Sequence, residues 1–292
     1  MVYAVKDVPG KEPQASLSRE GASAFVLNTA WYGQLRGAAL ALAGQAAERS
    51  DGALLAACAA LDRGGAGALV WAAPGSGRAG ILAAALREEG VRLVAVDAVL
   101  VHGSDGVAEA ELPERKLYLP ATWLSAHPET ERFLERSKLE NMVVSHDACT
   151  VEFCPQASDC SLDRGAAACA RASVDGRIMV DPYWLKAGKG HVRRTRPRLA
   201  VLLTADPAAA AAAEIPGTEA ARRLAEGRLG KPGGRAVPFL DPRLPALDQA
   251  RQDRLRAQHE RLLAGLRCLV VNAALGTPES VARRILQALP PQ

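Results

Sequence analysis

The chain has 292 residues, 49% hydrophobic and 23% charged, so it is long enough to bury a full core and has an ordinary globular balance. Its formal net charge of +4 is too small to indicate a nucleic-acid partner. No run approaches the roughly 20 apolar residues that span a bilayer, and the first residues lack the apolar stretch of a signal peptide, so we expect a cytoplasmic protein.

The first half of the chain predicts a leader followed by a strand–turn–helix–strand unit. Residues 1–23 are polar and carry proline and glycine, so we expect a flexible leader before one domain over 24–292. The apolar patterns after the leader predict a helix over 31–47. The strand–turn–helix–strand unit follows, with a buried strand over 66–72, a glycine-rich turn, a helix over about 78–89 and a strand over 91–101. A hairpin turn is predicted at 103–106.

The second half begins with an irregular, cysteine-rich insertion at about 145–176 and a basic segment over 186–198. Later segments predict, in order, a strand over 198–206, a mobile loop over 227–238, an amphipathic helix over 247–266, a buried strand over 268–272 and a last helix capped by Thr277. Together these segments predict an α/β fold in which helices flank a mixed sheet.

A glycine-rich turn follows the strand at 66–72, where a phosphate-binding P-loop would lie. The P-loop pattern is G-x-x-x-x-G-K-[ST], and its first glycine, lysine and hydroxyl fall on Ala72, Arg78 and Ala79. The guanidinium of Arg78 can still bind a phosphate, whereas Ala79 cannot bind Mg²⁺. A plain connection between strand and helix is the alternative interpretation. The predicted cofactor-binding residues of this loop are Gly75, Ser76, Gly77 and Arg78.

Several segments resemble, in the same order, those of ATP-using phosphoenolpyruvate carboxykinase and the related HPr-kinase-like P-loop proteins. They are WYGQLRG (31–37), GALLAACAA (52–60), LVWAAPGSGRAGI (69–81), RLVAVDAVLV (92–101), KLENMVVSHDACTVEFC (138–154) with CARAS (169–173), VLLTADP (201–207) and LVVNAALG (269–276). The resemblance runs from about residue 24 to the end. It implies the nucleotide-binding fold of the carboxykinase C-terminal domain, with ATP or another nucleotide as the cofactor.

The resemblance also assigns roles to single residues. It places the family's metal-binding lysine at Arg36 and its metal-binding histidine at Ala57, and neither side chain can bind a metal. It places the carboxylate ligand at Asp97 and the phosphoryl-neutralising arginine at Arg171, which are therefore the predicted catalytic residues. Arg36 joins the predicted cofactor-binding set. Ordinary surface or salt-bridging roles are the alternative interpretation of Asp97 and Arg171.

The cysteine-rich insertion contains four thiols with the spacing C-x4-C-x5-C-x8-C. Four thiols in one irregular stretch can bind a tetrahedral zinc ion or an iron–sulfur cluster. Four free or incidentally paired thiols are the alternative, because the usual C-x2-C pair is absent. The predicted metal ligands are Cys149, Cys154, Cys160 and Cys169.

Three functional hypotheses remain open at this point. The first is a degenerate member of the family, a nucleotide- or phosphate-binding regulatory protein with little or no metal-dependent catalysis. The second is an active ATP-dependent kinase or carboxykinase-like phosphotransferase, in which Arg36, Arg78 and Arg171 supply the charge of the metal. The third is a scaffold or partner subunit that binds no nucleotide.

The sequence also bounds the partners. We expect a nucleotide or another phosphate-bearing small molecule and no membrane. The basic segment over 186–198 lacks the interleaved aromatic residues of single-strand nucleic-acid sites, so nucleic acid is not favoured. A protein partner or a homo-oligomer stays open.

Overall fold

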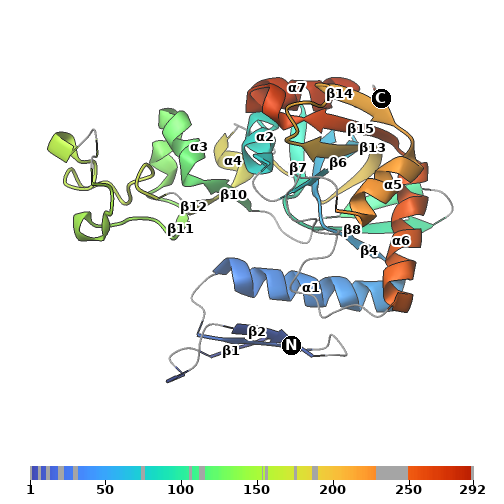
Figure 1. Ribbon diagram of the computed structural model, residues 1–292, viewed down its shortest axis with the longest axis horizontal. Helices are drawn as coiled ribbons and strands as arrows, with labels where there is room; N and C mark the ends of the chain where they lie inside the picture. Colours follow the sequence, from blue (N-terminus) through green and yellow to red (C-terminus); the bar gives the residue numbers. More distant parts are fainter. Residues whose placement is uncertain are drawn as a thin grey trace.

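The computed structural model describes residues 2–5, 8–10, 14–18, 23–28, 32–73, 76–104, 107–111, 116–152, 154, 157–173, 176–185, 190–227 and 249–290 (Figure 1). It has a mixed α/β architecture, as the sequence predicts. No helix among these residues is both long and apolar enough to cross a membrane.

The centre of the molecule is a six-stranded arm of a larger sheet. Its strands lie side by side in the order β7 (Val91–Ala95), β5 (Ala59–Arg63), β6 (Ala66–Ala72), β13 (Arg194–Thr204), β15 (Arg267–Asn272) and β14 (Ala212–Ile215). Strand β13 is parallel to both β6 and β15, whereas the other neighbours are antiparallel. Residues 199–203 of β13 are all buried, as expected for a strand covered on both faces.

A second arm of the sheet branches from the first residues of β13. These residues pair with β9 (Val107–Glu111), which pairs with β8 (Val99–Ser104), and β8 pairs with β4 (Leu54–Ala56). The antiparallel pairing of β8 with β9 confirms the predicted hairpin, although residues 105 and 106 of its turn lie outside the described residues.

The single strand predicted over 91–101 is wrong. The chain forms β7 and β8, separated by a bend at 96–98, and the two strands belong to different arms of the sheet. Apolar residues on both sides of the bend are buried, so a continuous apolar run hides the break. The bend matters because Asp97 lies in it.

Helices cover both faces of the sheet. Helices α2 (Arg78–Ala85) and α7 (Pro278–Ala288) pack on one core cluster, and α5 (Gly217–Ala225) and α6 (Gln249–Ala264) pack on the other. Helix α2 ends about four residues before the predicted end at Glu89, in turns that Gly90 closes at φ 75°. The predicted cap of α7 is confirmed, because the Thr277 side chain accepts a hydrogen bond from the Ser280 N–H at 3.3 Å.

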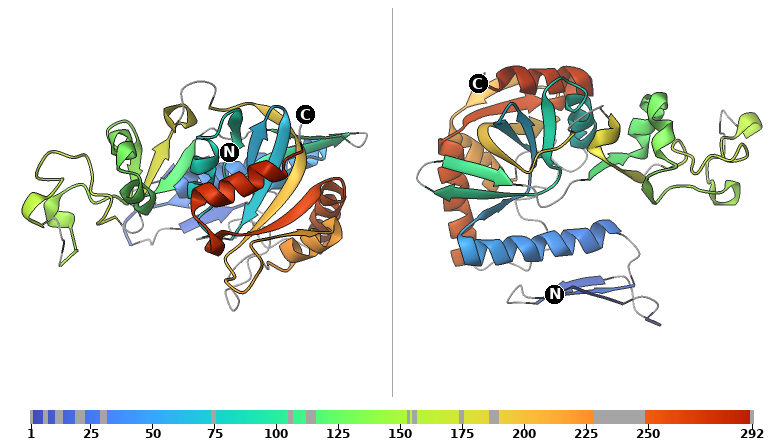
Figure 2. Two further views of the ribbon diagram at one scale, coloured as in Figure 1. Left: turned by 90° about the horizontal axis from the view of Figure 1, so that it is seen from above. Right: turned by 180° about the vertical axis from the view of Figure 1, so that it is seen from behind.

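A long helix, α1 (Tyr32–Asp51), lies between the main sheet and a small N-terminal sheet (Figures 1 and 2). The small sheet contains β1 (Val2–Val5), β3 (Ala24–Leu27) and β2 (Gln14–Leu17), in that spatial order. Two of these strands lie within the predicted leader over 1–23, where the sequence pattern did not reveal them. Each is only four residues long and lies among polar residues, prolines and glycines, so neither gives a period-2 pattern long enough to recognise in the sequence.

The described residues between 117 and 185 form a further unit at one side of the molecule, on the left in Figure 1. A three-stranded antiparallel sheet, in the order β10 (Leu117–Pro120), β12 (Arg177–Val180) and β11 (Lys138–Glu140), is flanked by α3 (Ala121–Ala126) and α4 (Pro182–Leu185). Beyond β11, the cysteine-rich stretch projects away from the body as turns and two short 3-10 helices, as Figure 1 shows on the left. Its predicted irregularity is confirmed.

Candidate functional site

The glycine-rich turn does connect β6 to α2, and it leaves the start of the helix without a side-chain cap. Gly77 is the N-cap residue, with φ 76° and ψ 11°, a left-handed conformation that favours glycine. Because glycine has no side-chain oxygen, Gly77 leaves the first N–H groups of α2 without a side-chain acceptor. These N–H groups and the helix dipole favour an anion at this end. Gly75, also predicted here, lies outside the described residues.

Three predicted residues meet beside this helix start. The Nη1 atom of Arg36 lies 2.8 Å from Oδ2 of Asp97, and the Nη2 atom of Arg78 lies 2.5 Å from Oδ1 of the same carboxylate. Arg36 comes from α1, Arg78 begins α2, and Asp97 lies in the bend between β7 and β8. The structure thus brings together residues that are 61 positions apart in the sequence. We call this group the Arg36–Asp97–Arg78 cluster.

The electrostatics of the cluster keep Asp97 ionised. Burial alone would raise the pKa of Asp97, but the charges of Arg78 and Arg36 and their hydrogen bonds outweigh burial and hold the pKa below its ordinary value. The aromatic ring of Tyr118 lies 4.4 Å from the guanidinium carbon of Arg36 and adds a cation–π contact. With one carboxylate between two guanidinium groups, the cluster carries a net charge of +1.

The serine of the turn adds an unsatisfied hydroxyl. The Oγ atom of Ser76 is buried and has no hydrogen-bond partner among the described residues. Its backbone N–H donates to the carbonyl of Ala73 at 3.2 Å, which closes the turn. A buried hydroxyl without a partner is uncommon in folded proteins. It is therefore a group that a ligand at the start of α2 could satisfy.

The cluster offers little to a metal ion. Both carboxylate oxygens of Asp97 accept hydrogen bonds from arginines, and Ala57 and Ala79 carry no donor atoms. Burial raises the pKa of the Cys58 thiol far more than the charge of Arg78 lowers it, so this neighbour stays protonated. The groups that pair with Asp97 are therefore guanidinium groups, which cannot bind a metal.

Arg171, the other predicted catalytic residue, is not part of the cluster. Its side chain is exposed in the irregular stretch that follows Cys169. Within the described part of the chain, the ion pairs of Asp97 are those with Arg36 and Arg78. The phosphoryl-neutralising role assigned to Arg171 stays a prediction.

The predicted zinc or iron–sulfur site has no support from the structure. Cys149, Cys154, Cys160 and Cys169 are partly exposed free thiols, and no three His, Cys, Asp or Glu side chains of the described residues gather into a metal site. The four thiols are close in the sequence, but the turns between them determine where each side chain lies in space. Backbone bonds order part of the stretch: the Cys169 N–H donates to the carbonyl of Val143 at 2.8 Å. Metal binding by these cysteines stays a prediction.

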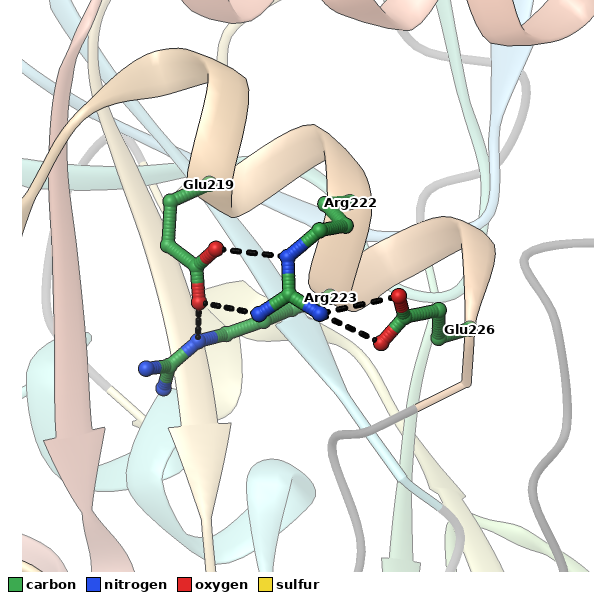
Figure 3. A network of polar contacts seen from close by, with 4 residues as sticks. All are labelled: Glu219, Arg222, Arg223 and Glu226. Carbon is green, nitrogen blue, oxygen red and sulfur yellow. Dashed lines mark hydrogen bonds and ion pairs between the residues drawn. The ribbon is translucent and has the colours of Figure 1, made fainter.

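A second group of ion pairs, on α5, is of the ordinary surface kind (Figure 3). Glu219 pairs with Arg222 and Arg223, and Arg222 also pairs with Glu226. Hydrogen bonds from Arg222 and Arg223 lower the pKa of Glu219 to about 2. These residues are three or four positions apart on one helix, a spacing that stabilises the helix itself. In contrast, the Arg36–Asp97–Arg78 cluster joins three separate elements.

Comparison with known proteins adds little to this picture. No protein family model matches the chain, and no curated protein sequence matches it. Among solved structures, the HPr(Ser) kinase/phosphatase from Coxiella burnetii aligns with a TM-score of 0.29 and 12% sequence identity, over 71% of this chain and 90% of that chain. At these values the likeness establishes neither a shared family nor a shared activity.

Proposed function

We propose that the chain is a nucleotide- or phosphate-binding regulatory protein with little or no metal-dependent catalysis. Its binding site would be the start of α2, together with the two guanidinium groups of the Arg36–Asp97–Arg78 cluster. The observation that carries the proposal is the position of this positively charged cluster beside a helix start that has no side-chain cap.

The guanidinium groups can contact a carboxylate and a ligand together. A guanidinium has five N–H groups, and the ion pair of each arginine with Asp97 joins one of its nitrogens to one carboxylate oxygen. Arg78 also stands at the first position of α2, so its charge adds to the positive end of the helix dipole. Bidentate contacts between a guanidinium and a phosphate are among the stronger hydrogen bonds in proteins. Ser76 Oγ would supply a further contact.

The same residues favour binding over phosphoryl transfer. Transfer depends on a metal ion that bridges the phosphates and neutralises the developing charge. The side chains of Ala57 and Ala79 have no atom that can bind a metal, and Asp97 forms ion pairs with two arginines. An active phosphotransferase would need guanidinium charge in place of metal charge, and a scaffold would need no ligand at all. These alternatives are outcomes of the experiment below.

Calorimetric titration with pyrophosphate and with ATP tests the proposal, each with Mg²⁺ and with EDTA. We expect a dissociation constant between micromolar and millimolar, on the order of −4 to −8 kcal/mol of binding free energy. Arg36→Ala and Arg78→Ala should each weaken binding by about tenfold. Arg283→Ala, which changes an exposed arginine of α7, is the matched control and should bind like the wild type.

Each other outcome points to one of the alternatives. Absence of binding at millimolar ligand would make the turn a plain connection and favour the scaffold. Binding that appears only with Mg²⁺ would favour the enzyme. Because EDTA removes the metal and leaves the arginines unchanged, the two titrations separate these cases.

A further inference from the structure

A cavity of about 690 Å³ lies at the opposite end of β6 from the glycine-rich turn. Three arginines of β13 line it, together with Glu109 of β9, Pro290 after α7 and the Gly64–Gly65 turn that precedes β6. Strand β6 has seven residues, so the cavity and the start of α2 are separated by roughly 20 Å of strand. The cavity is therefore independent of the site proposed above.

The pairing of β13 explains why a hollow forms at this place. Among the described residues, β9 pairs with β13 only through Arg194 and Thr195, and β15 pairs with it only from Leu199 onward. Between these points β13 has β6 as its strand partner. One edge of β13 thus lacks a neighbouring strand at 196–198, and the two arms of the sheet separate there.

A β-bulge lies at the same place in β13. Pro197 pairs with Gly67 and Leu199 pairs with Ala68, so Arg198 is the extra residue of the bulge. Proline has no N–H to donate, and a bulge is one of the few positions in a sheet that tolerates it. Arg194, Arg196 and Arg198 are all exposed, whereas the residues between them are buried.

The charges around the cavity are not balanced. Arg194 is neutralised, because its guanidinium pairs with Glu109 at 3.1 Å and with Glu111 at 2.8 Å. Arg196 and Arg198 form no ion pair within the described part of the chain. Two like charges two residues apart on a strand repel each other, and an anion between them would relieve the repulsion.

The nearest buried carboxylate does not provide that balance. Asp62 is fully buried behind Thr195, whose Oγ1 donates to it at 2.7 Å. Arg92 donates to the same carboxylate from Nε at 3.0 Å and from Nη2 at 2.5 Å. The charge of Asp62 is thus already paired with Arg92, and these contacts fix the wall of the cavity at Thr195.

We propose that this cavity binds a small polyanion with at least two phosphate or carboxylate groups. Alternate residues of a strand are roughly 6.5 Å apart, a separation that two anionic groups of one metabolite can span. The volume is in the range of small-molecule sites. The described residues of the lining include no aromatic residue on which a nucleic-acid base could stack, so a small ligand is favoured over a single strand.

Titration of the full chain with pyrophosphate and with citrate tests this proposal. We expect an Arg196→Ala/Arg198→Ala double variant to bind the tighter-binding of these two anions about a hundredfold more weakly than the wild type. Each arginine accounts for about tenfold of this loss. Arg193→Ala is the matched control, because Arg193 is an exposed neighbour that does not line the cavity. Arg78→Ala should also retain this binding event, since that substitution affects only the start of α2.

The relative affinities of the two anions assign the chemistry. Tighter pyrophosphate binding indicates a phosphate ligand, and tighter citrate binding indicates a carboxylate ligand. If the alanine variant melts at a lower temperature than the wild type, Arg196→Gln/Arg198→Gln provides a second pair that keeps more of each side chain. The proposal is overturned by unchanged affinity in the folded double variant, by absence of binding at millimolar anion, or by tighter binding of a single-stranded oligonucleotide at this surface.

Discussion

Replacing Asp97 with Asn removes the charge between two guanidinium groups and keeps the shape of the side chain. The carboxylate lies 2.8 Å from Arg36 and 2.5 Å from Arg78, so the variant leaves two cations together in a partly buried place. Breaking a buried ion pair costs about 3–5 kcal/mol, and breaking an exposed pair costs about 0–1 kcal/mol. Because the Asp97 side chain is 38% exposed, we expect Asp97→Asn to lower the free energy of unfolding by about 2 kcal/mol after this discount for solvent screening.

The same substitution should tighten the binding of a phosphate-bearing ligand. In the wild type, the carboxylate of Asp97 neutralises part of the positive charge that attracts a phosphate to the start of α2, and in the variant this competition for charge is gone. A gain of about 1.4 kcal/mol corresponds to about tenfold tighter binding. The ligand should also restore the stability of the variant. A ligand concentration a hundredfold above the dissociation constant adds about 2.7 kcal/mol to the free energy of unfolding.

Urea denaturation with and without pyrophosphate, together with calorimetry, measures both effects. Asp159→Asn is the control, because Asp159 is an exposed carboxylate whose pair with Arg164 is long, at 3.4 Å. It should change neither stability nor affinity. Asp97→Asn with wild-type stability and unchanged or weaker pyrophosphate binding would refute the reasoning. A loss of stability combined with weaker binding would indicate that Asp97 organises the site rather than competing with the ligand.

Three further predictions concern the turn, a buried histidine and catalysis. Gly77→Ala should lower the free energy of unfolding by about 1–2 kcal/mol in urea denaturation, because Gly77 has φ 76°. Gly103→Ala is the control and should cost less, because a Cβ at Gly103 would have equally open space around it and Gly103 has no positive φ. Burial lowers the pKa of His259 to about 4, so the unfolded state binds more protons between about pH 6.5 and pH 4. Stability should therefore fall by about 3 kcal/mol as the pH drops through that window, and His259→Phe should flatten the dependence measured by denaturation at each pH. A coupled assay with oxaloacetate, ATP and Mn²⁺ should give no phosphoenolpyruvate above background, and robust turnover would contradict this expectation.

Segments with a strong local signal were predicted well from the sequence. The strand over 66–72 has the predicted bounds, because an apolar run of strand length ends at a glycine-rich turn. The last helix begins at Pro278 as predicted, because Thr277 is a good cap and proline suits the first helical position. In both cases the information lies within a few neighbouring residues.

Features that depend on distant segments were not predicted. Nothing in the sequence near Arg194 indicates that β13 pairs first with β9 and later with β15. The cavity depends on that change of strand partner. Similarly, Tyr118 lies under Arg36 only because β10 and α1 pass close to each other, and no local pattern records this. Pairing between strands and packing between elements are set by the whole chain, so single-segment periodicity cannot give them.

The Arg36–Asp97–Arg78 cluster shows how the residue types of a site constrain its function. A metal ion accepts lone pairs from a phosphate oxygen and polarises it as a Lewis acid, whereas a guanidinium can only donate hydrogen bonds and contribute charge. Guanidinium charge is also permanent over the physiological pH range, so such a site would need neither metal nor a particular pH to bind its ligand. Under the proposed function, a site with arginines and no metal ligands would recognise phosphate and lack most of the means of transferring it.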